Sequence, residues 1–206
     1  MREGRKSKRF VSCAFVLPAC RFAFMLKPIL RANLDVLFVG FNPHPYSWER
    51  GRYYAHGSLW RILRKSGLAP DIQNDSQLFD YNFGITDLIH DRPTREAKEI
   101  PDADYAVAVL RFRRQLTRLA PRVACFTGKD VYRHFAGLKR STAIDYGVAG
   151  SFKKSVLFVA PFPSHKWITD AEKARHYKQI ERVLSDDTLL RAPERATVRS
   201  STSKRF

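Results

Sequence analysis

Cysteine is scarce in this 206-residue chain, and the three cysteines, Cys13, Cys20 and Cys125, form no C-x-x-C pair. No cluster of histidines accompanies them, so nothing favours a zinc site, an iron–sulfur cluster or a disulfide framework. No apolar run is long and clean enough to span a membrane. We therefore expect a protein of the reducing cytoplasm, with no metal site and no membrane partner.

Signature motifs of several common enzyme classes are absent as well. The sequence contains no G-x-x-x-x-G-K-[ST], no G-x-G-x-x-G, no H-E-x-x-H and no G-x-S-x-G. Phosphoryl transfer by a P-loop, nucleotide-dependent redox chemistry and ordinary serine hydrolysis therefore gain no support from the sequence.

Acidic residues are few compared with basic ones. Lysine and arginine number 37 against 20 aspartates and glutamates, which gives a formal net charge of +17. A surplus of this size predicts attraction to polyanions such as nucleic acid. The alternative is a basic surface, with basic tails, that serves solubility alone.

The two ends of the chain differ from its middle. Residues 2–9 are basic and residues 10–26 largely apolar, which resembles a secretory signal, but Arg21 interrupts the run and no small-residue cleavage site follows. We interpret residues 1–33 as an N-terminal extension, with Met25 as the expected start of translation. Residues 34–186 form the predicted domain, and the Arg/Ser/Thr-rich residues 187–206 form a tail that we expect to be disordered.

Apolar strands alternate with amphipathic helices through the middle of the chain. Residues 35–40, 123–127 and 155–160 are almost continuous apolar runs, which are typical of buried parallel strands. Residues 80–88 predict a strand edge or an extended segment, and residues 144–154 a hairpin or an irregular turn. Helices are predicted over residues 58–67, 102–120 and 128–136, and after an N-cap at Thr169. The pattern predicts a three-layer α/β/α domain with a short, mainly parallel central sheet.

Two of these strands end in polar, proline-containing loops. The first reads "GFNPHPYS" from Gly40, and the second reads "PFPSHKW" after Ala160. Ligands of open α/β sheets bind at the carboxyl ends of the strands. We therefore expect both loops to open on one edge and to share a site.

Each residue that stands out has a plainer interpretation beside the functional one. Asn42 in an Asn-Pro step is a common turn initiator. Tyr54, in "ERGRYYAHG", is either part of a packed aromatic pair or a stacking surface set among Arg50 and Arg52. Lys166 and Trp167 are either a solvated charge beside a core aromatic or a wedge that enters a base stack.

The ordered set of segments "VLFVGFNPHP", "YYAHGSLWRILRKSGL", "FGITDLIHDRPTREAKEI", "VACFTGKDVYRHF" and "LFVAPFPSHKW" resembles the mismatch-specific uracil-DNA/thymine-DNA glycosylase family of the uracil-DNA glycosylase superfamily. The resemblance extends over roughly residues 34–184. It implies a uracil-DNA glycosylase-like α/β fold without cofactor or metal. It also implies a monofunctional base-excision-repair enzyme that hydrolyses the N-glycosidic bond of uracil or thymine mispaired with guanine and leaves an abasic site.

The resemblance also implies roles for individual residues. Asn42 corresponds to the residue that positions the water, and Tyr54 to the aromatic residue that stacks on the base. The segment that enters the gap left by the flipped nucleotide corresponds to Ser164, His165, Lys166 and Trp167. The base-binding residues implied are Phe41, His44, Tyr54, Phe162 and Ser164, while Arg50 and Arg52 are expected to contact the DNA backbone. The expected partner is double-stranded DNA with a mismatched or damaged base, bound by a monomer at the nucleoid.

This chain departs from the family pattern at three places. His44 stands where the family usually has glycine, Phe162 precedes "PS", and "SHKW" is bulkier and more basic than usual. His44 and Phe162 motivate one alternative, a glycosylase for another lesion such as hypoxanthine. A second alternative is a non-catalytic nucleic-acid-binding relative.

The chemistry expected of such a site needs no acid. Fixed donors stabilise the departing base anion in a dry pocket, at ~3–4 kcal/mol for each donor. The Asn42 carboxamide holds water through its carbonyl oxygen without adding a negative charge. Base rotation out of the duplex costs a few kcal/mol, least at a mismatch, and a plug of Lys166 or Trp167 offsets part of that cost. We expect a slow, selective enzyme.

Overall fold

The centre of the fold is a five-stranded sheet. The structure, a computed structural model, describes residues 26–96, 99–186 and 188. The strands lie in the order β2-β1-β3-β5-β4, and every neighbouring pair is parallel except β4 with β5. Their bounds are β1 (Val36–Gly40), β2 (Phe83–Asp87), β3 (Val123–Thr127), β4 (Gly147–Phe152) and β5 (Ser155–Ala160). The prediction of a short, mainly parallel sheet is confirmed.

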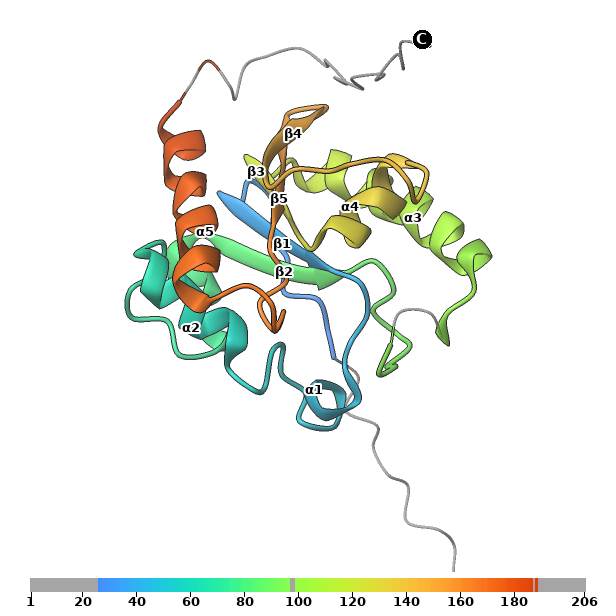
Figure 1. Ribbon diagram of the computed structural model, residues 1–206, viewed down its shortest axis with the longest axis horizontal. Helices are drawn as coiled ribbons and strands as arrows, with labels where there is room; N and C mark the ends of the chain where they lie inside the picture. The colour runs from blue at the N-terminus through green and yellow to red at the C-terminus, as the bar shows by residue number, and fades with distance from the viewer. Residues whose placement is uncertain (1–25, 97–98, 187, 189–206) are drawn as a thin grey trace, which may run out of the picture.

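Helices cover both faces of this sheet. They are α1 (Pro45–Glu49), α2 (Ser58–Ser66), the 3-10 helix η1 (Asp75–Tyr81), α3 (Asp102–Leu119), α4 (Lys129–Ala136) and α5 (Asp170–Ser185). Figure 1 shows α2 and α5 on one side of the sheet and α3 and α4 on the other. This is the predicted three-layer arrangement. No helix within the described ranges combines the length and the apolar character needed to cross a bilayer.

Alternation along the strands explains the two layers. On β1, Val36 and Phe38 pack in the core on the side of α2 and α5, whereas Leu37 and Val39 pack in the core on the side of α3 and α4. All four side chains are fully buried. A strand covered on both faces needs apolar side chains in both directions, so it has a continuous apolar run.

The segment before β1 packs against the sheet. Leu26 is buried, and the backbone of Ile29 exchanges two hydrogen bonds with that of Ile85, at 2.9 and 3.0 Å. Gly84 permits this close approach, because a Cβ atom there would lie 2.7 Å from the Ile29 carbonyl oxygen. Leu26 and Ile29, which the sequence assigns to the extension, thus pack against the sheet. Residues 1–25 and 189–206, with the predicted start and most of the predicted tail, lie outside the described residues.

Candidate active site

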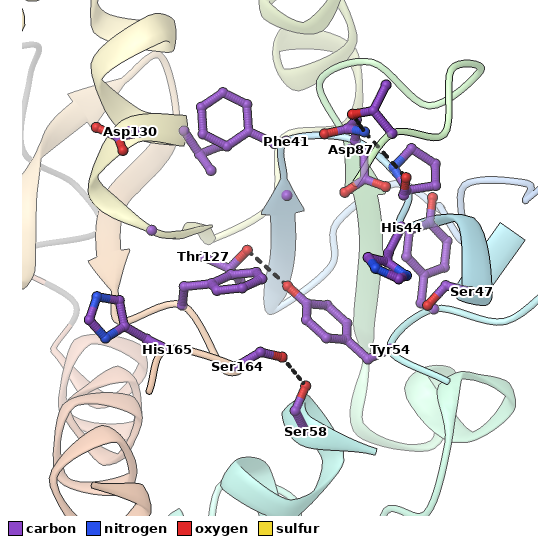
Figure 2. A pocket seen from close by; sticks show the side chains of 18 of the residues that line it. Phe41, His44, Ser47, Tyr54, Ser58, Asp87, Thr127, Asp130, Ser164 and His165 are labelled. Carbon is purple, nitrogen blue, oxygen red and sulfur yellow. Dashed lines mark hydrogen bonds between the residues drawn. The ribbon is translucent and has the colours of Figure 1, made fainter. Parts of the chain in front are cut away.

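The loops that follow β1 and β5 line a single pocket of about 720 Å³. Figure 2 shows it at the carboxyl end of the sheet, with Phe41 and His44 from the first loop and Ser164 and His165 from the second. Parallel strands end at a common edge, so residues more than a hundred positions apart meet there. The sequence-based expectation that these two loops share a site agrees with this geometry.

The carboxamide of Asn42 lines the pocket and is held in one orientation. Its nitrogen donates hydrogen bonds to Thr94 Oγ1 at 2.7 Å, to the Pro43 carbonyl at 3.2 Å and to the Arg92 carbonyl at 3.3 Å. With the nitrogen committed to three acceptors, the Asn42 oxygen remains as the group that can accept a hydrogen bond from a ligand or water. The loop after β2 therefore fixes the orientation of a residue that follows β1.

Tyr54 forms an aromatic wall of the pocket. Its backbone has a φ of 46°, a left-handed conformation that is uncommon outside glycine. The Tyr54 hydroxyl donates to Thr127 Oγ1 at 3.1 Å, and Thr127 in turn donates to the Val39 carbonyl at 3.0 Å. Burial raises the pKa of Tyr54, so its hydroxyl stays protonated and keeps donating. The ring of Phe162 lies 6.4 Å from that of Tyr54, centroid to centroid.

The β5–α5 loop, residues 161–169, is tied to two helices. Ser164 Oγ lies 2.9 Å from Ser58 Oγ at the start of α2. From α5, Lys173 Nζ donates to the Pro163 carbonyl at 2.8 Å. Tyr177 Oη donates to the Pro161 carbonyl at 3.1 Å. Because Lys173 is only 3% exposed, the loop rests on a buried ammonium group.

Two of the predicted DNA-contacting residues project from this loop into solvent. Lys166 is exposed and the Trp167 side chain is 91% exposed, and neither lines the pocket. The Trp167 backbone N–H donates to His165 Nδ1 at 3.2 Å, and His165 does line the pocket. Lys166 and Trp167 therefore stand beside the pocket mouth.

The remaining predicted residues lie around the pocket in different ways. Phe41 lines it, but its ring packs edge-on against Tyr105 and His134 of the α3–α4 layer. His44 lines it and also caps α1, because its Nδ1 accepts the Tyr46 N–H at 3.2 Å. Both side chains thus have structural contacts in addition to their place in the pocket.

Arg50 and Arg52 line a second, adjacent hollow that shares Tyr54 with the main pocket. The Arg50 guanidinium lies 4.2 Å from the centre of the Tyr46 ring. Both arginines are exposed. They are therefore available to a polyanion that crosses this side of the pocket.

The pocket also contains an acid that the sequence analysis did not single out. Asp87, the last residue of β2, lines it with its carboxyl (Figure 2). That carboxyl lies over Gly40, where an added Cβ would be only 2.1 Å from Asp87 Oδ1. Burial raises the pKa of Asp87 to about 7. The sequence could have pointed to Asp87, because this residue ends β2, and the carboxyl ends of β1 and β2 lie at the same edge of the sheet.

The comparison with protein families agrees with this geometry. The family model of the uracil DNA glycosylase superfamily matches residues 28–185, well over half of the chain. The chain belongs to the uracil DNA glycosylase superfamily. Members of this superfamily are DNA N-glycosylases, hydrolases that act in DNA repair, and the predicted fold and superfamily are therefore confirmed. Among its described residues, this superfamily member has no group of three or more His, Cys, Asp or Glu side chains that could hold a metal ion.

Proposed function

We propose that this superfamily member is a monofunctional, mismatch-specific DNA glycosylase that removes uracil, or thymine, opposite guanine. The observation that supports this best is the fixed carboxamide of Asn42 in the same pocket as Tyr54 and Ser164. We propose that it acts as a monomer on chromosomal DNA in the cytoplasm.

Asn42 positions the attacking water in this proposal. Its nitrogen is held by Thr94 and two backbone carbonyls, so its oxygen accepts a hydrogen bond from water and orients it toward C1′ of the sugar. The C1′–N bond breaks with its electron pair leaving on the base, and the water oxygen bonds to C1′. The proton that this water loses passes through solvent to the base anion, so the products are a neutral base and an abasic site. Orientation of this kind needs no movement at the moment of reaction, because the hydrogen bonds to the nitrogen are already formed.

Tyr54 supplies the surface on which the extruded base stacks. Its ring is anchored through its hydroxyl to Thr127 rather than left free to rotate. Base–aromatic stacking contributes about 1–3 kcal/mol, which offsets part of the cost of unstacking in the duplex. The pocket volume of about 720 Å³ accommodates a purine as well as a pyrimidine, so hypoxanthine is the second candidate substrate.

Lys166 and Trp167 fill the vacancy left by the extruded nucleotide. Trp167 has almost no packing partners of its own, and the loop behind it is anchored by Lys173 and Tyr177. A rigid loop that carries an exposed indole and an ammonium group suits insertion between bases beside phosphates. Arg50, Arg52 and the net charge of +17 add sequence-independent attraction to the backbone.

The test is excision by Asn42→Ala from oligonucleotides with a single G·U, A·U, G·T or hypoxanthine site, followed by alkaline cleavage. We expect a loss of about 10²–10⁴ in the single-turnover rate on the G·U duplex, the range for removal of a group that handles the water. Duplex binding, measured by fluorescence anisotropy, should stay near the wild-type value. Undiminished excision by the variant would remove Asn42 from the mechanism. A strand break without alkali, with borohydride trapping of a protein–DNA adduct, would contradict monofunctional action.

A further inference from the structure

The second hollow, next to the pocket of the candidate active site, has a volume of about 540 Å³. Tyr53 and Tyr54 line both hollows and therefore form a shared wall. The other lining residues of the second hollow come from α1, from α2 and from the loops before and after α2: Tyr46, Arg50, Arg52, Ala55, Gly57, Trp60, Gln73 and Asn74. The volume lies within the range of pockets that hold small organic ligands.

The loop that carries the shared wall, residues 50–57, is fixed by hydrogen bonds. The Arg52 N–H donates to the Ser47 carbonyl at 3.1 Å. The Tyr53 N–H donates to Asp75 Oδ2 at 2.7 Å, and Asp75 is only 7% exposed. The hollow is therefore preformed, and a ligand can bind to it without the cost of ordering this loop.

Two free cations line the second hollow. Arg50 and Arg52 are both exposed, and neither forms a salt bridge or a side-chain hydrogen bond with any residue that the structure describes. No Asp or Glu of the described ranges lines the hollow, since the Asp75 carboxyl lies outside the lining. Guanidinium groups without an acid partner favour an anion with several acceptor oxygens, such as a phosphate.

Asn74 adds a neutral donor to this hollow. Its carbonyl oxygen caps η1, because it accepts from the Ser76 N–H at 3.0 Å and from Ser76 Oγ at 2.7 Å. Its nitrogen donates to no acceptor in the described part of the chain. The Asn74 amide can therefore only donate, which suits a ring nitrogen or a carbonyl oxygen on the edge of a nucleobase.

A stack of three side chains connects the second hollow with the main pocket. The Arg50 guanidinium lies 4.2 Å from the centre of the Tyr46 ring, and the His56 ring stacks on Tyr46 with centroids 3.9 Å apart. Both groups lie directly over the Tyr46 ring, so they occupy its opposite faces. Arg50 lines the second hollow, whereas His56 lines the main pocket. The stack therefore runs along the boundary that a strand with one nucleotide in each hollow must cross.

We propose that the second hollow is a subsite for the nucleotide next to the extruded one in the same strand. Arg50 and Arg52 bind the phosphodiester that joins the two nucleotides, and Asn74 donates to the base edge of the neighbour. The shared wall then separates two consecutive nucleotides. This inference rests on the proposed glycosylase function and adds to it a dependence of excision on the neighbouring base.

The experiment measures single-turnover excision from single-stranded oligonucleotides with one uracil, because opening of base pairs then does not enter the rate. An abasic spacer replaces the 5′ neighbour, the 3′ neighbour or a distant nucleotide in separate substrates. The wild-type rate at limiting enzyme should fall by about tenfold when one of the two neighbours lacks its base. It should stay within about twofold when the spacer is distant.

Asn74→Ser tests the contact with the neighbouring base. Serine is an equally good N-cap for η1, but it has no amide donor. We expect excision to fall by about fivefold on the intact substrate, the effect of one lost hydrogen bond. On the substrate that lacks the neighbouring base, the variant should match wild type, because the contact is already absent.

Arg52→Gln tests the contact with the phosphodiester. We expect excision to fall by about tenfold on the intact substrate and to stay near the wild-type rate when an uncharged methylphosphonate replaces that linkage. Arg118→Gln is the matched control, since Arg118 is exposed on α3 on the other side of the sheet, and it should stay within about twofold of wild type.

Three results would overturn the inference. Asn74→Ser with equal losses in the presence and absence of the neighbouring base makes no contact with that base. Arg52→Gln that behaves like Arg118→Gln shows general attraction by a basic surface. Wild-type excision that ignores both neighbouring spacers rejects the subsite and leaves the glycosylase function intact.

Failure of the function itself gives a different result. If wild type excises uracil from no substrate, the proposed glycosylase function is rejected, and fluorescence anisotropy on the same oligonucleotides still compares binding with and without the neighbouring base. Equal affinities in that comparison reject the subsite as well. Urea unfolding of each variant distinguishes loss of a contact from loss of the fold.

Discussion

Replacement of Lys173 by methionine tests how the β5–α5 loop is held. The Lys173 ammonium is 3% exposed and donates to the Pro163 carbonyl at 2.8 Å and to Asp170 Oδ1 at 3.4 Å. Methionine has a similar length but no donor, so the Pro163 carbonyl loses a partner. Asp170 keeps its ion pair with Arg61 at 2.6 Å, and the link between α2 and α5 therefore survives.

The expected magnitude follows from these contacts. A hydrogen bond from a charged donor contributes about 1.5–3 kcal/mol, and methionine avoids part of the cost of burying an ammonium group. We therefore expect the free energy of unfolding to fall by about 1–2 kcal/mol. We also expect the loosened loop to reduce excision from G·U duplex by about tenfold, because insertion into the base stack depends on its position. Excision from single-stranded DNA, which needs no wedge, should be nearly unchanged.

Urea unfolding and single-turnover excision on both substrates measure these effects. Lys178→Met is the matched control, since Lys178 is exposed on the same helix and should show wild-type stability and activity. The reasoning is refuted if Lys173→Met unfolds like the control, or if duplex and single-strand excision fall by the same factor.

Substitutions at two further positions, Gly40 and Tyr54, examine the floor and the wall of the pocket. Gly40→Ala places a methyl group 2.1 Å from Asp87 Oδ1 and must displace that carboxyl. We therefore expect excision from the G·U duplex to fall by about 10²-fold. A wild-type rate would show that the position of Asp87 is unimportant. Tyr54→Phe removes the hydrogen bond to Thr127 but keeps the ring, and it should cost about fivefold in excision. Tyr54→Ala also removes the stacking surface and should cost at least about tenfold more, and equal losses for the two variants would contradict stacking.

Much of the fold could be predicted because local patterns determine it. The strands at residues 123–127 and 155–160 match β3 and β5 to the residue, since both are buried on both faces. Thr169 caps α5 as expected, with its hydroxyl accepting the Glu172 N–H at 3.2 Å. The short helices α1 and η1 were not predicted. Their 5 and 7 residues are too few to show a period, and their starts depend on caps at His44 and Asn74.

The site was harder to predict because its decisive contacts are tertiary. The Asn42 carboxamide is held in one orientation by a hydrogen bond to Thr94, a residue that lies 52 positions further along the chain. The Asp87 carboxyl occupies its position only because Gly40, in the neighbouring strand, has no side chain there. A local sequence pattern carries no information on such neighbours. The sequence therefore identified Asn42 and Tyr54, but not Asp87, whose carboxyl lies over Gly40 of the neighbouring strand.

The contacts that shape the pocket join distant parts of the chain. Thr94 lies 52 residues from Asn42, Thr127 lies 73 residues from Tyr54, and Ser164 lies 106 residues from Ser58. Local folding of any one segment therefore forms none of these three contacts. Contacts of such long sequence separation slow folding, because the loops between them must close first. A nascent or partly unfolded chain thus lacks the contacts that hold the Asn42 carboxamide and the Tyr54 ring in place, and the pocket is complete only in the complete fold.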